Sequence, residues 1–247
     1  DATLREAQYR RARNPRFCLQ TARQIVAGKI HNMTAFGRRQ RRLDEAGKRH
    51  LAVIDGVGQR LDSAETLEQI MGHEGAASAA YFRLMRSFLR FDLGFRQRRA
   101  YPPTDPVNAL LSLGYTLLYN HLYAAINVVG LDPYQGFLHQ LKRGHAALAS
   151  DLVEEWRAII VDSVVLTLVN RREIQASDFE NSPEGFRLTR AALTRFCQRY
   201  DARVKDAVFV PGIQGSTAYR RCFELQVRQL ARVLLGEEPT YQPFAVR

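Results

Sequence analysis

Apolar residues recur at every third or fourth position along most of the chain, which is the spacing of one face of an α-helix. Alternation of apolar and polar residues, which is typical of a half-buried strand, is scarce. The run from Ala207 to Val210, ahead of Pro211 and Gly212, is the one fair strand candidate. Because the sequence also contains no internal repeat and no low-complexity linker, the pattern predicts an all-α fold.

Helix starts are marked where a capping residue precedes proline, because the cap side chain accepts a free N–H and proline suits the first helical position. Four dipeptides have this form: Asn14-Pro15, Asp105-Pro106, Asp132-Pro133 and Ser182-Pro183. Helices are predicted at about 15–37, 39–61, 73–91, 106–129, 147–170, 184–200 and 217–235. We expect residues 1–235 to form one helical domain and residues 236–247 to form a loosely attached C-terminal tail.

The stretch from Pro106 to Leu131 carries no formal charge and is long enough to cross a bilayer. Polar residues nevertheless recur there at every fourth position, at Asn108, Ser112 and Thr116, and make a stripe along one helical face. Such a stripe favours a buried central helix with one wet edge over a lipid-facing helix. No membrane association is therefore expected.

Composition adds a strong basic surplus to this picture. The chain has 36 Lys and Arg against 25 Asp and Glu, a formal net charge of +11. A surplus of this size favours a polyanionic partner, because each neutralised phosphate releases condensed counterions. The three cysteines, Cys18, Cys197 and Cys222, are scattered without a CxxC pair, and no secretory signal is visible. Both features favour a reducing cytoplasm.

Arginines are the candidates for phosphate contact. Arg83, Arg86 and Arg90 are three and four residues apart, so they share one face of a predicted helix. Arg98 and Arg99 continue the series beyond its end. The alternative for any one of them is an ordinary solvated helix surface. As a set, they predict DNA binding with a steep dependence on salt.

Polar residues that could carry chemistry occur at three separate places. Glu74 precedes a run of small residues, His139 follows two apolar residues, and Asp151 and Glu154 share a helical face. Taken singly, each has a plainer explanation as a helix-start acid, a half-buried histidine or a surface ion pair with Arg157. Together they supply the carboxylates and the imidazole of an open Mg²⁺ or Mn²⁺ site that acts on a phosphodiester.

These residues lie in five ordered segments that resemble the CRISPR-associated adaptation integrase/endonuclease family, the universal spacer-acquisition protein. The segments are Ala22–Asn32, Glu74–Phe82, Pro102–Tyr115, Gly130–His139 and Leu148–Arg157. The resemblance covers about Asn14 to Tyr200 and is to the helical catalytic domain of that family. The family's N-terminal β domain has no counterpart in this chain. That is expected of a fragment, or of one segment of a fusion such as one with a reverse transcriptase.

The resemblance implies a metal-dependent DNA endonuclease and integrase. Such a protein inserts spacer DNA into a CRISPR array when a DNA 3′-hydroxyl attacks a phosphodiester by transesterification. It implies Glu74, His139 and Glu154 as ligands of Mg²⁺ or Mn²⁺, with Asp151 as a further catalytic acid and Asn108 lining the site. Asp151 is suited to fixing the tautomer of the histidine ligand.

The resemblance also implies partners: double-stranded DNA (prespacer and CRISPR repeat), a second copy in a homodimer, a small CRISPR-associated adaptation protein and, in a fusion, a reverse transcriptase. Two other functions stay open on the residues alone. One is a non-catalytic helical DNA-binding scaffold within a larger adaptation fusion, and the other is a metal phosphohydrolase of small nucleotides. The arginine surplus argues against the second.

Overall fold

The computed structural model describes residues 2–40, 43–139, 142–210 and 215–246, and most of them are helical. The α-helices are α1 (Ala2–Ala12), α2 (Pro15–Arg38), α3 (Glu45–Arg60), α4 (Leu67–Phe88), α5 (Pro106–Val129), α6 (Ala147–Val153), α7 (Ser163–Asn170), α8 (Arg190–Lys205) and α9 (Tyr219–Leu235). Two short 3-10 turns, η1 (Leu61–Ser63) and η3 (Ala176–Asp178), and a π-helix, η2 (Arg157–Asp162), join them. The prediction of a mainly helical fold is confirmed.

The same ranges contain two small antiparallel hairpins. β1 (Phe179–Ser182) pairs with β2 (Gly185–Leu188), and β3 (Ala207–Phe209) pairs with β4 (Ser216–Ala218). The strand expected after residue 206 is therefore present as β3, although residues 211 and 212 of that prediction lie outside the described residues. The first hairpin was not anticipated.

Two of the predicted helix starts are confirmed by their caps. The Asn14 side chain accepts the N–H groups of Arg16 and Phe17 at the start of α2. The Asp105 side chain accepts the N–H of Asn108 at the start of α5. Because proline follows each cap, both helices begin where the sequence predicts.

Two other helices begin away from the predicted positions. Asp44 caps α3, which therefore starts after the predicted residue 39. Thr66 caps α4 through the N–H of Gln69, so this helix begins at Leu67 and not near residue 73. The interpretation of Glu74 as a helix-start acid is therefore wrong, because Glu74 lies in the third turn of α4.

Two of the proline dipeptides make turns and do not start helices. The carboxylate of Asp132 accepts the N–H of Tyr134 and the hydroxyl of Tyr9, which closes a tight turn. Ser182 ends β1 opposite Gly185, and Pro183 and Glu184 form the turn of the first hairpin. A short polar side chain before proline stabilises either structure, so the dipeptide alone does not distinguish them.

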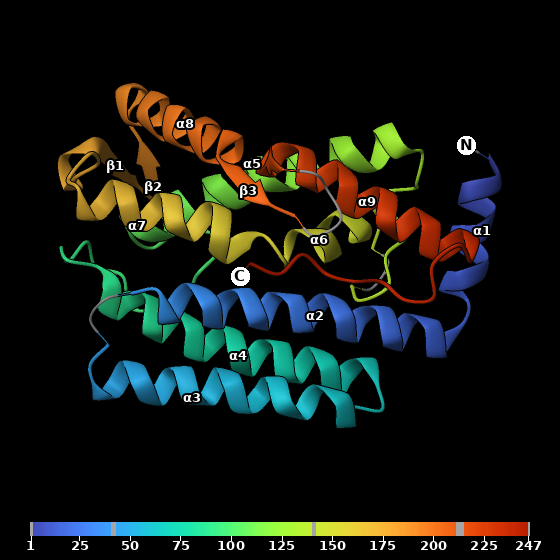
Figure 1. The fold of residues 1–247 in the computed structure, drawn as a ribbon. Helices are drawn as coiled ribbons and strands as arrows, with labels where there is room; N and C mark the ends of the chain where they lie inside the picture. Colours follow the sequence, from blue (N-terminus) through green and yellow to red (C-terminus); the bar gives the residue numbers. More distant parts are fainter. Residues whose placement is uncertain (1, 41–42, 140–141, 211–214, 247) are drawn as a thin grey trace.

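The helices form two groups on either side of α2 (Figure 1). α3 and α4 pack against each other and against one side of α2, whereas η2 and α6 pack on its other side. α5 runs through the second group and packs against α6 and α9. α2 therefore lies between the two groups of helices, and both groups pack against it.

α5 is buried, as the sequence predicts for a core helix. Leu110, Leu118, Leu122 and Ile126 are completely buried along its inner face. Thr116 lies on its exposed edge. Within the ranges that the structure describes, no helix is both long enough and apolar enough to cross a membrane.

The C-terminal tail is not loosely attached. Tyr241, Phe244 and Val246 are buried, and the ring of Phe244 stacks on Trp156 with the ring centroids 4.3 Å apart. The N–H of Val246 donates to the side chain of Asn32 on α2 at 3.0 Å. Figure 1 shows this segment lying along α2 as it returns toward the middle of the molecule. The tail is thus part of the core.

Candidate active site

A break in one helix shapes the site. The helix predicted over 147–170 is interrupted after Val153, and the chain continues as the π-helix η2 and then as α7. A π-helix has more residues per turn than an α-helix, so it changes the direction in which the following side chains point. Asp151, Glu154 and Glu155 are all buried around this break.

Asp151 holds the segment that carries His139. Its fully buried carboxylate accepts the N–H groups of Phe137, Leu138 and His139 at 2.6, 3.0 and 2.9 Å. It also lies 2.7 Å from Nδ1 of the His139 ring. Gly136 permits this close approach, because a Cβ there would lie 2.6 Å from an Asp151 oxygen.

The contact with Asp151 directs the imidazole. When Nδ1–H donates to Asp151, the lone pair of Nε2 is left to bind a ligand. Burial alone would lower the pKa of His139. The hydrogen bond and charge of Asp151, together with the charges of Glu154 and Glu74, raise it. His139 therefore lies in the negative field of both predicted carboxylate ligands, and its side chain is 33% exposed.

Glu74 and Glu154 meet at a single ammonium group. The Nζ atom of Lys29, on α2, forms ion pairs with Oε1 of Glu74 and with Oε2 of Glu154. Lys29 is only 2% exposed, whereas Glu74 and Glu154 are 27% and 8% exposed. The Ser78 hydroxyl donates to Glu74 at 2.7 Å. Two of the three predicted metal ligands are thus brought together from α4 and from the break after α6.

Glu154 is strongly held as a carboxylate. Burial opposes its ionisation, but the charges of Arg157 and Lys29 lower its pKa to about 2. Arg157 donates to Oε1 of Glu154 at 2.9 Å, and its guanidinium lies 4.1 Å from the centre of the Tyr115 ring. The other oxygen of Glu154, Oε2, forms the ion pair with the Lys29 ammonium.

Two carboxylates and one imidazole are a donor set suited to Mg²⁺ or Mn²⁺. Within the described ranges, however, no three His, Cys, Asp or Glu side chains are arranged to hold a metal ion. The Lys29 ammonium lies where the two carboxylates would bind a shared metal ion. The residues therefore fit a metal in the chemistry of their donor atoms, provided that the Lys29 side chain, which pairs with both carboxylates, moves.

A basic pocket of about 440 Å³ adjoins Glu74. Its lining includes Arg83, Arg98 and Arg157. Arg98 is held in place by its donation to Asn108 at 3.0 Å and to Ser112 at 3.1 Å. A negatively charged ligand in this pocket would therefore lie beside the carboxylate pair and against fixed guanidinium groups.

The other predicted DNA-contacting residues are placed differently. Arg86, Arg90 and Arg99 are exposed outside the lining of the pocket. Asn108 is fully buried, and its side chain bonds Asp105, the carbonyl of Gln97, Arg98 and the N–H of Arg99. Asn108 therefore positions the arginine segment, and the expectation that it lines the site is corrected.

Lys29 is the residue that the sequence analysis missed. It lies four residues after Ile25 and three after Val26, so it falls on the buried face of α2. A lysine in an apolar stripe needs a buried partner, and that was the available signal. Arg157 was considered only as a surface partner, yet its side chain is 22% exposed and part of the site.

Comparison with known proteins identifies the family of this chain. Residues 1–202 match the family described as CRISPR associated protein Cas1. A CRISPR-associated endonuclease Cas1 of Thermus thermophilus is 39% identical over 100% of this chain and 73% of its own length. The chain belongs to the Cas1 family.

Two further matches concern larger proteins. A CRISPR-associated exonuclease Cas4/endonuclease Cas1 fusion of Geobacter sulfurreducens is 38% identical over 98% of this chain, which spans only 45% of that protein. A chain of a Cas6-RT-Cas1--Cas2 complex superimposes with a TM-score of 0.88 at 27% identity, over 99% of this chain and 27% of that chain. The helical domain is thus similar to a part of longer fusions.

Proposed function

We propose that this chain is the catalytic domain of a metal-dependent DNA endonuclease and integrase. It inserts spacer DNA into a CRISPR array when a DNA 3′-hydroxyl attacks a phosphodiester of the repeat. The observation that carries the proposal is that Glu74 and Glu154 pair with one buried cation, Lys29. The charges of both carboxylates also act to raise the pKa of His139. Membership of the Cas1 family, whose relatives are named endonucleases, supports it.

Glu74, Glu154 and Nε2 of His139 would hold the Mg²⁺ or Mn²⁺ ion. When bound, such an ion polarises the phosphate and stabilises charge on the attacking and leaving oxygens. Asp151 keeps the proton of His139 on Nδ1, so that Nε2 stays free to coordinate. Arg157 keeps Glu154 ionised at neutral pH.

The basic pocket is the proposed binding site of the DNA backbone around the reacting phosphate. Arg83, Arg98 and Arg157 line it beside Glu74. Guanidinium groups suit phosphate because they donate two parallel hydrogen bonds. Arg86, Arg90 and Arg99 extend the basic surface beyond the pocket, and the net charge of +11 supports the same partner.

We propose the remaining partners on the same basis. The likeness to a part of a Cas6-RT-Cas1--Cas2 complex supports a small CRISPR-associated partner and a fused reverse transcriptase. A homodimer that binds both ends of the DNA fragment completes the proposal. The test is strand transfer of labelled DNA into a repeat-bearing plasmid, with the small partner present.

Glu74→Ala is expected to lower metal-dependent strand transfer by at least about 100-fold, because one of the two carboxylates that would hold the ion is lost. Glu68→Ala, an exposed acid in the first turn of the same helix, is the matched control and should keep wild-type activity. Full metal-dependent strand transfer by Glu74→Ala would overturn the proposal.

One observation favours a second candidate, the non-catalytic DNA-binding scaffold. Lys29 already pairs with both carboxylates, as it would in a chain that never binds metal. A scaffold binds repeat DNA but shows neither nicking nor strand transfer with Mg²⁺ or Mn²⁺. The same assay therefore separates the two candidates, and free nucleotides as substrates test the small-nucleotide phosphohydrolase.

A further inference from the structure

Lys29 is a cation that the chain itself supplies to the site. Its Nζ contacts Glu74 on one side and Glu154 on the other, and the side chain is 2% exposed. A buried ammonium and buried carboxylates are each costly alone, so they stabilise one another. Arg157 also pairs with Glu154, so Lys29 is the cation that the two carboxylates share and Arg157 balances the second negative charge.

The backbone that carries Lys29 is held firmly. Gly28 packs so closely on the tail that a Cβ there would lie 2.4 Å from Pro243. Asn32, one turn further along, donates to the carbonyls of Glu155 and Phe244 at 2.8 and 2.7 Å. α2 is therefore clamped on both sides of Lys29, and only the flexible four-carbon side chain is free to leave the carboxylates.

Each carboxylate also has a contact other than Lys29. Glu74 accepts the Ser78 hydroxyl, and Glu154 accepts Arg157, both at 2.9 Å or less. Glu74 and His139 are also partly exposed, at 27% and 33%, so an ion can reach the pair from solvent. If the ammonium withdraws, two anchored carboxylates remain facing one another.

We propose that Lys29 is a displaceable counter-cation: it holds Glu74 and Glu154 together without metal, and a divalent ion must displace it to bind. This inference rests on the metal site of the proposed function. Lys29 is thus a positioning residue that lowers the affinity for metal while it stabilises the metal-free protein. An ordinary structural ion pair would stabilise the protein without competing with an ion.

The test measures Mn²⁺ binding to the whole chain by electron paramagnetic resonance, together with thermal unfolding with and without Mn²⁺. Lys29→Met is expected to lower the metal-free Tm by about 10 °C, because two buried carboxylates lose their cation. It is expected to tighten the Kd for Mn²⁺ by about tenfold and to recover the lost Tm when Mn²⁺ is added. Unchanged or weaker Mn²⁺ binding by Lys29→Met would overturn the inference.

Lys29→Arg provides a second measurement that does not depend on the stability of Lys29→Met. A guanidinium pairs with two carboxylates at once and is a stronger competitor, so Mn²⁺ binding should weaken by about tenfold. Equal or tighter binding by Lys29→Arg would contradict displacement. Lys48→Met, at an exposed lysine that pairs with Glu45 on α3, is the control and should change neither Tm nor Kd.

Glu74→Ala separates this inference from the proposed function. If the wild-type chain and Glu74→Ala bind Mn²⁺ equally, the proposed metal site itself is wrong, and the inference fails with it. If Glu74→Ala loses binding but Lys29→Met gains none, the metal site stands and only the role of Lys29 is wrong. If neither the wild-type chain nor Lys29→Met binds Mn²⁺, Lys29 does not compete with an ion.

Discussion

Glu154 and Glu155 are neighbours in the sequence, both are buried, and they face opposite environments. Glu154 points to Lys29 and Arg157, whose charges bring its pKa to about 2 against the effect of burial. Glu155 points to the C-terminal tail, where Tyr241 and the N–H of Phe244 donate to its two oxygens. Burial dominates there and raises the pKa of Glu155 to about 8.

The difference separates a reactive carboxylate from a structural one. Glu154 pairs with two cations and is held ionised, which is the charge state that a metal ligand requires. Both oxygens of Glu155 are used by neutral donors, so this side chain is suited to joining the tail to the core. Consecutive residues of a helical turn point roughly 100° apart, which directs the two side chains to different neighbours.

The same isosteric change at both positions tests the difference between their environments most directly. Glu154→Gln removes the negative charge between Lys29 and Arg157 and should lower the free energy of unfolding by about 3–5 kcal/mol. Glu155→Gln should cost less than about 1 kcal/mol, because an amide can still accept from Phe244 and donate to the Tyr241 hydroxyl. Urea unfolding of both variants, with the m-value compared, measures the two effects.

Equal losses at the two positions would contradict the assignment of one charged and one neutral environment. A small loss in Glu154→Gln would also mean that Lys29 and Arg157 find other partners when the charge is removed. In that case the buried cation would not depend on Glu154.

A second effect concerns the tail. Glu155→Ala removes the acceptor of the Tyr241 hydroxyl and of the Phe244 N–H, and each buried donor left unpaired costs about 1–3 kcal/mol. The tail should then open more often, so hydrogen exchange at Phe244 and Val246 should become faster. Exchange within α4 should stay unchanged, and faster exchange there would show that the damage spreads beyond the tail.

The elements that could be predicted from the sequence are those with local signals. Asn14-Pro15 and Asp105-Pro106 set the starts of α2 and α5 because the cap contacts lie within three residues. Thr66 caps α4 without a following proline, so its helix start was placed too late. Ser182-Pro183 has the same local form as the correct starts, and only its pairing in a hairpin decides its structure.

The residues of the candidate site also divide into those that a local sequence pattern indicates and those that it does not. Glu74, His139, Asp151 and Glu154 could be selected because carboxylates and a histidine occur in ordered motifs. Lys29 lies 45 residues before Glu74 and 125 before Glu154, and no local pattern reports contacts over such separations. Its position on the apolar face of α2 indicates burial but does not name its partners.

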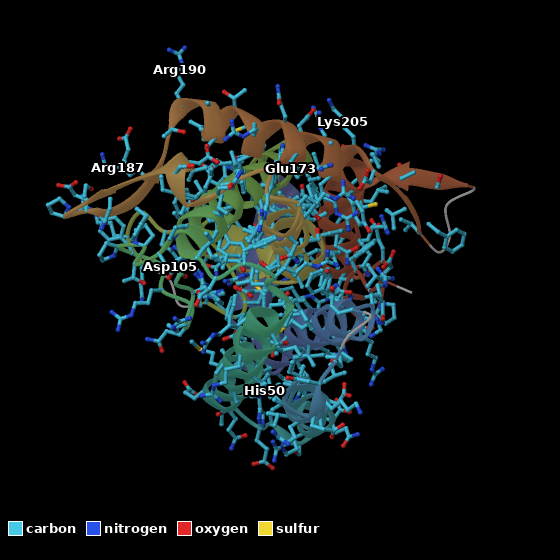
Figure 2. The ribbon with its side chains drawn as sticks, turned by 90° about the vertical axis from the view of Figure 1, so that its left-hand side faces the viewer. His50, Asp105, Glu173, Arg187, Arg190 and Lys205 are labelled. Atoms are coloured by element: carbon cyan, nitrogen blue, oxygen red, sulfur yellow. The ribbon has the colours of Figure 1, made fainter. Side chains whose placement is uncertain are left out.

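The smallest change is expected at the DNA-binding surface beside the carboxylates, when one arginine is removed from the pocket. Arg98→Ala should weaken binding to duplex DNA and reduce the salt slope of log Kd by about 1, because one phosphate contact is lost. Arg190, which points away from the body of the molecule at the start of α8 (Figure 2), is the matched control. Arg190→Ala changes the net charge equally but does not touch the pocket, so it should leave the slope nearly unchanged. If both variants shift the slope by the same amount, the arginines act only through net charge, and the pocket beside Glu74 is not where the backbone binds.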